Sequence, residues 1–312
     1  LANIEVICVD DGSTDATPTI LADYARTDAR LKVISQSNAG PAKARNRAIE
    51  VAQGDYLYCC DADDFCKPNL LEGAVQVAEC YDADVVLLPF MLYDNKIATS
   101  ISVPWSLPRH LFPEGCFTWH DNPDATFSTF RTVPWNKLVR TSFIRDNAIH
   151  FQDDVFLSED VMFSLPAAVL AQRVACTDEP ALYHRENIGT SAMDTKDAHP
   201  LDFVRAFQAL RAFLEEQGCM CELRHSYLVW VAGGCVYNLL TLKNRESFDE
   251  VFSYLNSCGL HDLDISEADL SEIDNVDDVN VLRAIFANDR DRLLHAEQLR
   301  LRMAVDQACY RE

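Results

Sequence analysis

Two short acidic clusters, each directly after an apolar run, constrain the fold of this chain most strongly. Asp10-Asp11 follows the run at residues 4–9, and the cluster at residues 61–64 follows the run at residues 56–60. Short runs rich in β-branched and aromatic residues that end at Asp or Gly are typical of buried parallel strands. Open α/β sheets bind their ligands outside the carboxyl ends of such strands. We therefore expect carboxylates from distant parts of the chain at one edge of one sheet.

The first ninety residues alternate strand signals with helix signals. The strand signals fall at residues 4–9, 31–34, 56–60 and 85–90, with helix signals between them. Two of these helices open at a proline, Pro41 and Pro68, where a missing N–H does no harm. Strands that alternate with helices of this length indicate parallel βαβ units. We predict an α/β, Rossmann-like fold with a mostly parallel sheet and flanking helices.

The next hundred residues are less regular. Residues 93–132 hold four prolines without clear periodicity, and we expect a binding loop there. Ser158 is predicted to cap a helix whose first turn holds Glu159 and Asp160, and Pro166 to end or kink that helix early. Further strand signals fall at residues 133–140, 173–177 and 181–184.

Beyond about residue 198 the apolar periodicity is helical, as at Phe203, Phe207 and Leu210. We therefore expect two domains, at residues 1–198 and 199–312. The acidic stretch at residues 262–278 is expected to be a solvated linker. The C-terminal helices have three open roles: holding an acceptor, forming a homodimer or covering the sheet.

The balance of charge limits the partners of this 312-residue chain. Its net charge of −22 argues against a nucleic-acid partner and against direct adhesion to anionic lipid, since both need a basic surface. The twelve cysteines show no zinc-finger spacing and no leader precedes them, which favours reduced thiols and a cytoplasmic location. The apolar stretch at residues 227–240 is interrupted by glycines and too short to span a bilayer.

Asp61-Ala62-Asp63 has the sharpest chemical signal. In an extended segment, residues i and i+2 face the same way, so Asp61 and Asp63 would point into one cleft. Hard cations such as Mg²⁺ or Mn²⁺ take one or two carboxylates together with phosphate oxygens. The alternative is an ordinary acidic turn after a strand, because Asp is a common turn residue.

Asp10-Asp11 strengthens the first of these interpretations. Alternation along a strand lets one of the two carboxylates point into the cleft, where it would accept a hydrogen bond from a nucleobase or a ribose hydroxyl. The other would cap or brace the following turn. Helix capping by Ser13 or Asp15 explains part of the motif in either case.

Taken together, these motifs resemble the family 2 glycosyltransferases of the GT-A fold. The matching segments are Val9–Asp15, Asn38–Asn46, Gly54–Asp64, Trp135–Leu138 and Ser158–Phe163. They occur in the order of the family and cover roughly residues 1–190. The C-terminal helices add nothing to the resemblance.

The resemblance implies an inverting transfer of a sugar from a nucleotide-sugar, usually a UDP-sugar, with Mn²⁺ or Mg²⁺. The acceptor would be a saccharide or a lipid-linked oligosaccharide of a surface polysaccharide, and the enzyme would reach the inner face of the membrane through that acceptor. Asp160 would be the general base, with Glu159 beside it. As an alternative, both are first-turn residues favoured by the helix dipole.

The resemblance also implies binding roles for the other motif residues. Asp10 or Asp11 would contact the base of the nucleotide, which Arg45 also faces. Asp61 would lie at the ribose and the metal, and Asp63 would be the main metal ligand. Three further residues are candidates on weaker grounds: Arg185 as a phosphate clamp or a plain surface residue, Trp135 as a wall of the sugar or acceptor pocket or a core aromatic, and Asp64 beside that pocket.

One departure from the family concerns the start of the chain. The family begins with a strand and a Pro-x-Tyr-Asn-type loop some thirty residues before the Asp-Asp motif, and we expect that strand to be missing here. A non-catalytic nucleotide-sugar binder is therefore an alternative. A receiver-type phospho-acceptor domain is a weaker one, because residues 85–90 end in Pro89-Phe90 and lack the hydroxyl residue a receiver needs.

Overall fold

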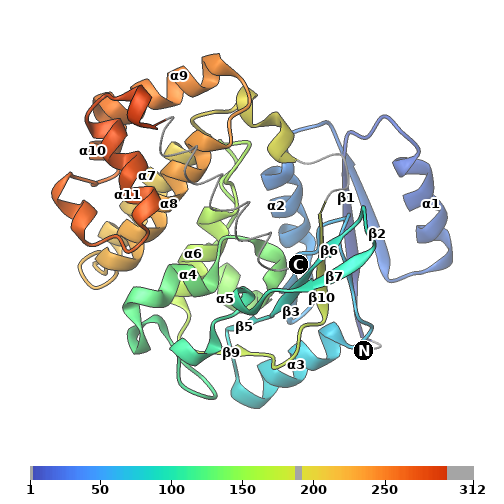
Figure 1. Ribbon diagram of the computed structural model, residues 1–312. Helices are drawn as coiled ribbons and strands as arrows, with labels where there is room; N and C mark the ends of the chain where they lie inside the picture. Colours follow the sequence, from blue (N-terminus) through green and yellow to red (C-terminus); the bar gives the residue numbers. More distant parts are fainter. Residues whose placement is uncertain (1–2, 187–191, 294–312) are drawn as a thin grey trace. The chain divides into compact units, whose positions relative to one another are not determined.

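The parallel βαβ unit at the start of the chain is present in the computed structural model, which describes residues 3–186 and 192–293. β1 (Val6–Asp11) pairs in parallel with β2 (Leu31–Gln36), with Asp11 opposite Gln36 at the carboxyl end. α1 (Thr17–Thr27) connects the two strands, and α2 (Pro41–Val51) follows β2 and packs on β1 (Figure 1). Asp11 thus lies beside the turn that leads into α2.

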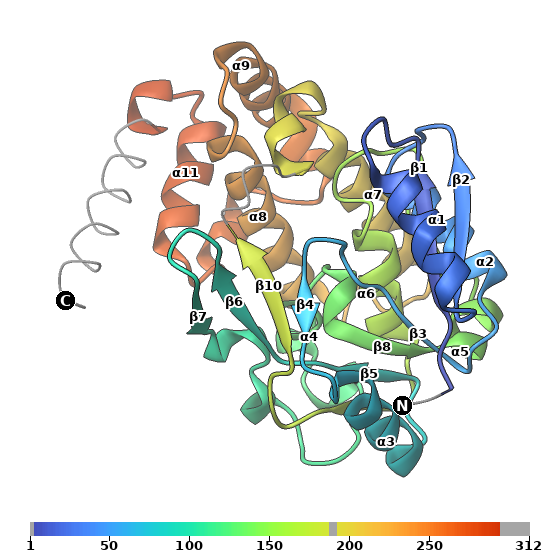
Figure 2. The same cartoon turned by 90° about the vertical axis from the view of Figure 1, so that its right-hand side faces the viewer.

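A second sheet carries the acidic turn at residues 61–64. Its strands, in spatial order, are β3 (Tyr56–Tyr58), β8 (Lys137–Arg140), β5 (Val85–Leu87) and β9 (Val174–Cys176). β8 is antiparallel to β3 and β5, and β5 is parallel to β9. Both views show α3 (Leu70–Tyr81) along this sheet beside β5 (Figures 1 and 2), and β5 is fully buried there.

A third sheet corrects the prediction of one strand at residues 85–90. β5 ends at Leu87 and a new strand begins at Phe90, because Pro89 lacks the N–H that a continuous ladder needs. The third sheet contains β4 (Phe65–Cys66), β10 (Leu182–Glu186), β6 (Phe90–Asp94) and β7 (Thr99–Ser102), in that order. The α/β fold class is confirmed, with mixed sheets in place of a mostly parallel one.

The helices after the irregular segment are α4 (Thr126–Phe130), α5 (Thr141–Asp146) and α6 (Val161–Leu170). Two predictions about α6 are wrong. Pro166 does not end the helix, which continues to Leu170 because Ser164–Val169 are buried and tertiary packing offsets the lost hydrogen bond. Ser158 does not cap it either, since Ser158 has φ +64° and the N-cap position belongs to Asp160.

The chain divides into two compact units, Leu1–Ser191 and Ala192–Glu312. The second unit is helical, as expected, with elements α7 (Asp202–Glu216), α8 (Arg224–Leu240), α9 (Arg245–Tyr254), α10 (Leu260–Asp262) and α11 (Val276–Phe286). In the described part of the chain, no helix combines the length and the apolar character that a membrane span requires.

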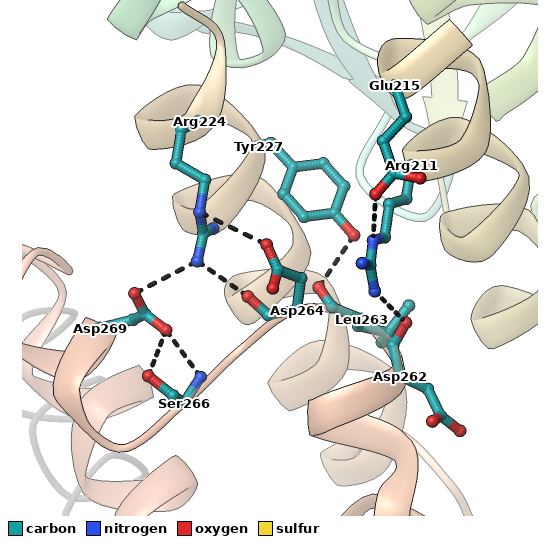
Figure 3. A network of polar contacts seen from close by, with 9 residues as sticks. All are labelled: Arg211, Glu215, Arg224, Tyr227, Asp262, Leu263, Asp264, Ser266 and Asp269. Atoms are coloured by element: carbon teal, nitrogen blue, oxygen red, sulfur yellow. Dashed lines mark hydrogen bonds and ion pairs between the residues drawn. The ribbon is translucent and has the colours of Figure 1, made fainter. Parts of the chain in front are cut away.

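The acidic stretch at residues 262–278 is not the solvated linker that its composition predicts. Leu263, Ile265, Leu270 and Ile273 are buried. Its backbone carbonyls accept hydrogen bonds from side chains of α7 and α8 (Figure 3), for example at Leu263, which accepts from the Tyr227 hydroxyl at 3.0 Å. The apolar residues between the acidic ones therefore anchor this stretch to the helical unit.

Candidate active site

The acidic cluster after β3 forms a tight turn. Asp64 N donates to Asp61 O at 3.2 Å, so Asp61-Ala62-Asp63 is not the extended segment that the sequence suggested. The turn nevertheless gathers the carboxylates of Asp61, Asp63 and Asp64, each of which offers an oxygen within 4.8 Å of the others. Like charges at this separation repel one another, and a cation or a hydrogen-bond donor relieves that repulsion.

The two carboxylates at the end of β1 brace backbone turns. Asp10 accepts from Ser13 N at 3.0 Å. Asp11 accepts from the Gln36 amide at 2.8 Å and from Ala39 N and Gly40 N at 2.9 Å each. Asp11 therefore fixes the start of α2, and the predicted contacts of Asp10 and Asp11 with a nucleotide stay predictions.

Gly12 allows this close approach. It has φ +79°, and a Cβ atom there would lie 2.8 Å from Asn38 N, on the segment that Asp11 binds. Any side chain would both strain the backbone and push this segment away. The glycine of the motif thus keeps β1 and the start of α2 together.

Arg45 joins the acidic turn to the Glu159-Asp160 pair. From α2, its guanidinium donates to Asp61 Oδ1 at 2.9 Å and to Glu159 Oε1 at 2.6 Å, and it lies 5.3 Å from the ring centroid of Phe151. Burial alone would lower the pKa of Arg45, but Asp61 and Glu159 together raise it. The sequence predicted that Arg45 faces the nucleotide. In the structure Arg45 holds two carboxylates, those of Asp61 and of Glu159, and Glu159 is 114 residues away from Arg45 in the sequence.

Asp160 lies at the start of α6, where its carbonyl accepts from Phe163 N and Ser164 N. Burial, and then the neighbouring charge of Glu159, raise the pKa of Asp160 to about 7, against the opposing charges of Arg45 and Lys137. Burial also raises the pKa of Asp61, and Arg45 opposes that shift. A carboxylate that titrates near neutral pH is suited to accept a proton from a hydroxyl.

Asp64 and Trp135 are buried. The sequence predicted a place beside the sugar or acceptor pocket for Asp64, and a wall of that pocket or a core aromatic for Trp135. The Asp64 side chain is 0% exposed and Trp135 is 5% exposed. Asp64 accepts from Arg185 N at 2.8 Å and pairs with His184 Nδ1 at 3.0 Å, and His184 stacks on Trp135 with ring centroids 4.6 Å apart. Asp64 and Trp135 therefore support the site and orient His184.

His184, next to Arg185, belongs to this arrangement although its own sequence context predicts no role for it. Burial would lower the pKa of His184, but its hydrogen bond with Asp64 outweighs this and raises it. The Arg185 guanidinium packs over the rings of Phe65 and Tyr93, at 5.3 and 5.9 Å, and its buried Nε has no hydrogen-bond partner among the residues that the structure describes. No local signal pointed to His184, because its partner Asp64, directly after the Asp-x-Asp motif, is 120 residues away in the sequence.

Comparison with known proteins identifies the class. Residues 1–144 match the model of Glycosyl transferase family 2. The chain is 28% identical over 265 residues to an uncharacterised glycosyltransferase of Bacillus subtilis, EpsJ, covering 81% of this chain and 76% of EpsJ. It is 42% identical over 222 residues to the uncharacterised glycosyltransferase YibD of Escherichia coli, covering 68% of this chain and 62% of YibD. Residues 1–144 are therefore a glycosyltransferase family 2 domain.

A solved structure supports the fold. The crystal structure of Staphylococcus aureus TarS residues 1–349 with UDP-GlcNAc matches 94% of this chain and 81% of that one, with a TM-score of 0.70 and 22% identity. At this identity the likeness shows the GT-A fold alone. In sequence, the chain is 28% identical to full-length TarS over 222 residues, which are 68% of this chain and 36% of TarS. The match to the glycosyltransferase family model and to curated glycosyltransferases argues against the receiver-type phospho-acceptor domain.

Proposed function

We propose that this chain is a metal-dependent, inverting glycosyltransferase that moves a sugar from a UDP-sugar to a saccharide acceptor in polysaccharide synthesis. The observation that carries the proposal is the double contact of Arg45, which holds Asp61 at 2.9 Å and Glu159 at 2.6 Å. One rigid side chain thereby sets the distance between the acidic turn and the residue next to the base.

The acidic turn would bind the diphosphate of the donor through a divalent cation. Its three carboxylates lie within 4.8 Å of one another and offer only oxygen, which fits Mn²⁺ or Mg²⁺. Asp63 is exposed and Asp61 has one oxygen beyond the one that Arg45 binds, so these two residues would hold the ion. When bound, the cation neutralises the charge on the leaving diphosphate.

Asp160 would take the proton of the acceptor hydroxyl. Its pKa of about 7 lets it be ionised at neutral pH and still retain basicity. An anionic carboxylate on the face opposite the diphosphate suits a single displacement, in which the acceptor oxygen attacks the anomeric carbon and the nucleoside diphosphate leaves. This order of events inverts the configuration at that carbon.

The donor and the acceptor follow from relatives and from charge. The TarS structure binds UDP-GlcNAc, and two relatives act on poly(ribitol-phosphate), so a UDP-hexose or UDP-N-acetylhexosamine is the proposed donor class. The two relatives act on a polyanion, but the net charge of −22 on this chain would repel one, and we therefore propose a neutral saccharide as the acceptor.

The proposal is tested by incubating the protein with UDP-GlcNAc, UDP-Glc or UDP-Gal, with Mn²⁺ or with EDTA, and a panel of neutral oligosaccharides. Release of UDP that requires the cation, and a new glycoside of inverted anomeric configuration by NMR, are expected. If UDP binds but no donor is ever turned over, the chain is instead the non-catalytic binder considered from its sequence.

A further inference from the structure

Lys137, the lysine of the Trp135–Leu138 motif, has a role that the proposed mechanism does not use. Its side chain is 1% exposed and its Nζ is surrounded by oxygens. It donates to Asn136 Oδ1 at 2.6 Å, to Ser164 Oγ at 3.3 Å and to Arg131 O at 3.4 Å, and also to Val133 O. Lys137 is thus a buried amine at the first residue of β8, enclosed by the turn that leads into that strand.

The oxygens around Lys137 favour its charged form. The two carbonyls and the amide oxygen only accept hydrogen bonds, and Ser164 Oγ spends its own proton on Thr132 O. A neutral amine has two N–H groups to offer these oxygens, whereas the ammonium has three. Burial lowers the pKa of Lys137 to about 7, and the charges of Asp160 and of Cys59 oppose that shift.

Ser164 connects Lys137 to the base. Ser164 N donates to Asp160 O at 2.9 Å, so the hydroxyl that Lys137 holds belongs to the first turn of α6. Ser164 is fully buried, which leaves this turn little freedom. The charges of the two groups also act on each other, since that of Asp160 raises the pKa of Lys137 and that of Lys137 lowers the pKa of Asp160.

We infer that Lys137 is a positioning residue for Asp160: its ammonium fastens the start of α6 to the turn before β8 and supplies the buried positive charge that keeps the base ionised. This inference rests on the proposed role of Asp160 as the base. The charged groups that act on Asp160 are then Glu159 beside it, Arg45 from α2 and Lys137 from β8. Arg45 is held by two other carboxylates, which leaves Lys137 as the cation that α6 itself engages.

The experiment titrates Asp160 directly, by NMR on protein with ¹³C-labelled Asp carboxyls, assigned by the loss of one signal in Asp160→Asn. In Lys137→Met the pKa of Asp160 should rise by about one unit, because an opposite charge has been removed. Lys32→Met is the matched control: it removes the same charge from β2, where Lys32 pairs with Glu5 at 2.6 Å, and should leave Asp160 unchanged. An Asp160 pKa that is the same in wild type and Lys137→Met overturns the inference, whatever the activity.

Kinetics then separate this inference from the proposed function. In Lys137→Met the acidic limb of the kcat/KM profile should move to higher pH and kcat should fall at least about tenfold, with the Kd for UDP unchanged. Ser164→Ala cuts the link to α6 but keeps the charge, so kcat should fall several-fold while the acidic limb stays in place. Should Lys137→Met not fold, full kcat in Ser164→Ala overturns the positioning role. A wild type that binds UDP without transferring sugar refutes the proposed function alone.

Discussion

Two charged networks, one in each unit, use the same residue types to different ends. In the helical unit Arg224 donates to Asp264 O at 2.8 Å and to Asp269 at 3.2 Å, and Asp269 also accepts from Ser266 N and Oγ (Figure 3). Burial alone would raise the pKa of Asp269, but Ser266 and Arg224 lower it. The donors of this network lower the pKa of the carboxylate that they bind, and the network holds the stretch at residues 262–269 on α8.

The network around Arg45 differs in the direction in which the pKa values of its carboxylates are shifted. Arg45 also binds two carboxylates. Burial nevertheless raises the pKa of Asp61 and of Asp160, and this effect outweighs the opposing charge of Arg45. The acidic turn adds Asp63, which is exposed. The bound carboxylate of the helical unit thus has a lowered pKa, whereas the two carboxylates near Arg45 have raised ones, as carboxylates at functional sites often do.

The largest expected effect comes from the base. Asp160→Asn should lower kcat at least about 100-fold because the acceptor hydroxyl loses its proton acceptor, while the Kd for UDP stays the same. UDP release with a cation and donor present measures kcat, and calorimetry measures binding. Asp146→Asn on the exposed end of α5 is the matched control, and an equal loss in both variants would refute the assignment.

The second effect concerns the cation. Asp63→Ala should weaken binding of UDP in the presence of Mn²⁺ at least about tenfold, since the exposed carboxylate of the turn is removed, and should leave binding without metal unaltered. Calorimetric titrations with Mn²⁺ and with EDTA compare the two conditions. Asp23→Ala on α1, where Asp23 pairs only with Arg26 in the described contacts, should behave as wild type. Equal affinity of Asp63→Ala and wild type would show that the turn holds no metal.

The third effect tests the raised pKa of Asp160 through stability. The pKa of Asp160 is raised in the folded protein, so ionising it costs folding free energy, and this cost appears as the pH rises from about 4 towards 7. Asn does not ionise. We therefore compare the free energy of unfolding of Asp160→Asn with that of wild type at two pH values. The difference should favour the variant by at least about 1 kcal/mol more at pH 8 than at pH 4. Thermal unfolding across this pH range measures it, and a difference that does not vary with pH would contradict the raised pKa.

The smallest effect belongs to the helical unit. Tyr227→Phe removes the hydroxyl that donates to Leu263 O and should cost about 1 kcal/mol of stability, since a buried carbonyl loses its partner. Denaturant unfolding measures this cost, and kcat should be unchanged. A large loss of activity without loss of stability would mean that this network, too, serves the reaction.

Local sequence patterns predicted much of the fold. The predicted strand runs correspond to β1, β2 and β3, and Pro41 is the first residue of α2, as predicted. These predictions succeeded because such signals depend on residues that are neighbours in the sequence. The hairpin of β6 and β7 was missed, since residues 85–90 read as one apolar run although Pro89 divides it between two sheets. Pro166 was misjudged for the opposite reason: burial around it overrides its local effect.

The candidate site was predicted in its residue types and less well in their contacts. The carboxylates of the motifs were found, but the attachment of Arg45 to Asp61 and Glu159 joins segments more than a hundred residues apart, which no local pattern contains. The other roles depend on burial, which the sequence does not show. Trp135 is buried and stacks on His184, and the position of Lys137 among buried oxygens is known only from the structure.

We propose that the acidic turn binds a metal and a nucleotide diphosphate next to Asp160. A crystal structure with Mn²⁺ and UDP, with data collected at the manganese absorption edge, would locate both ligands. We predict an anomalous peak in contact with a carboxylate oxygen of Asp63 and with the diphosphate, and an Asp160 carboxylate that faces the open side of the site. Manganese bound away from Asp63, or UDP bound away from residues 61–64, would contradict the account.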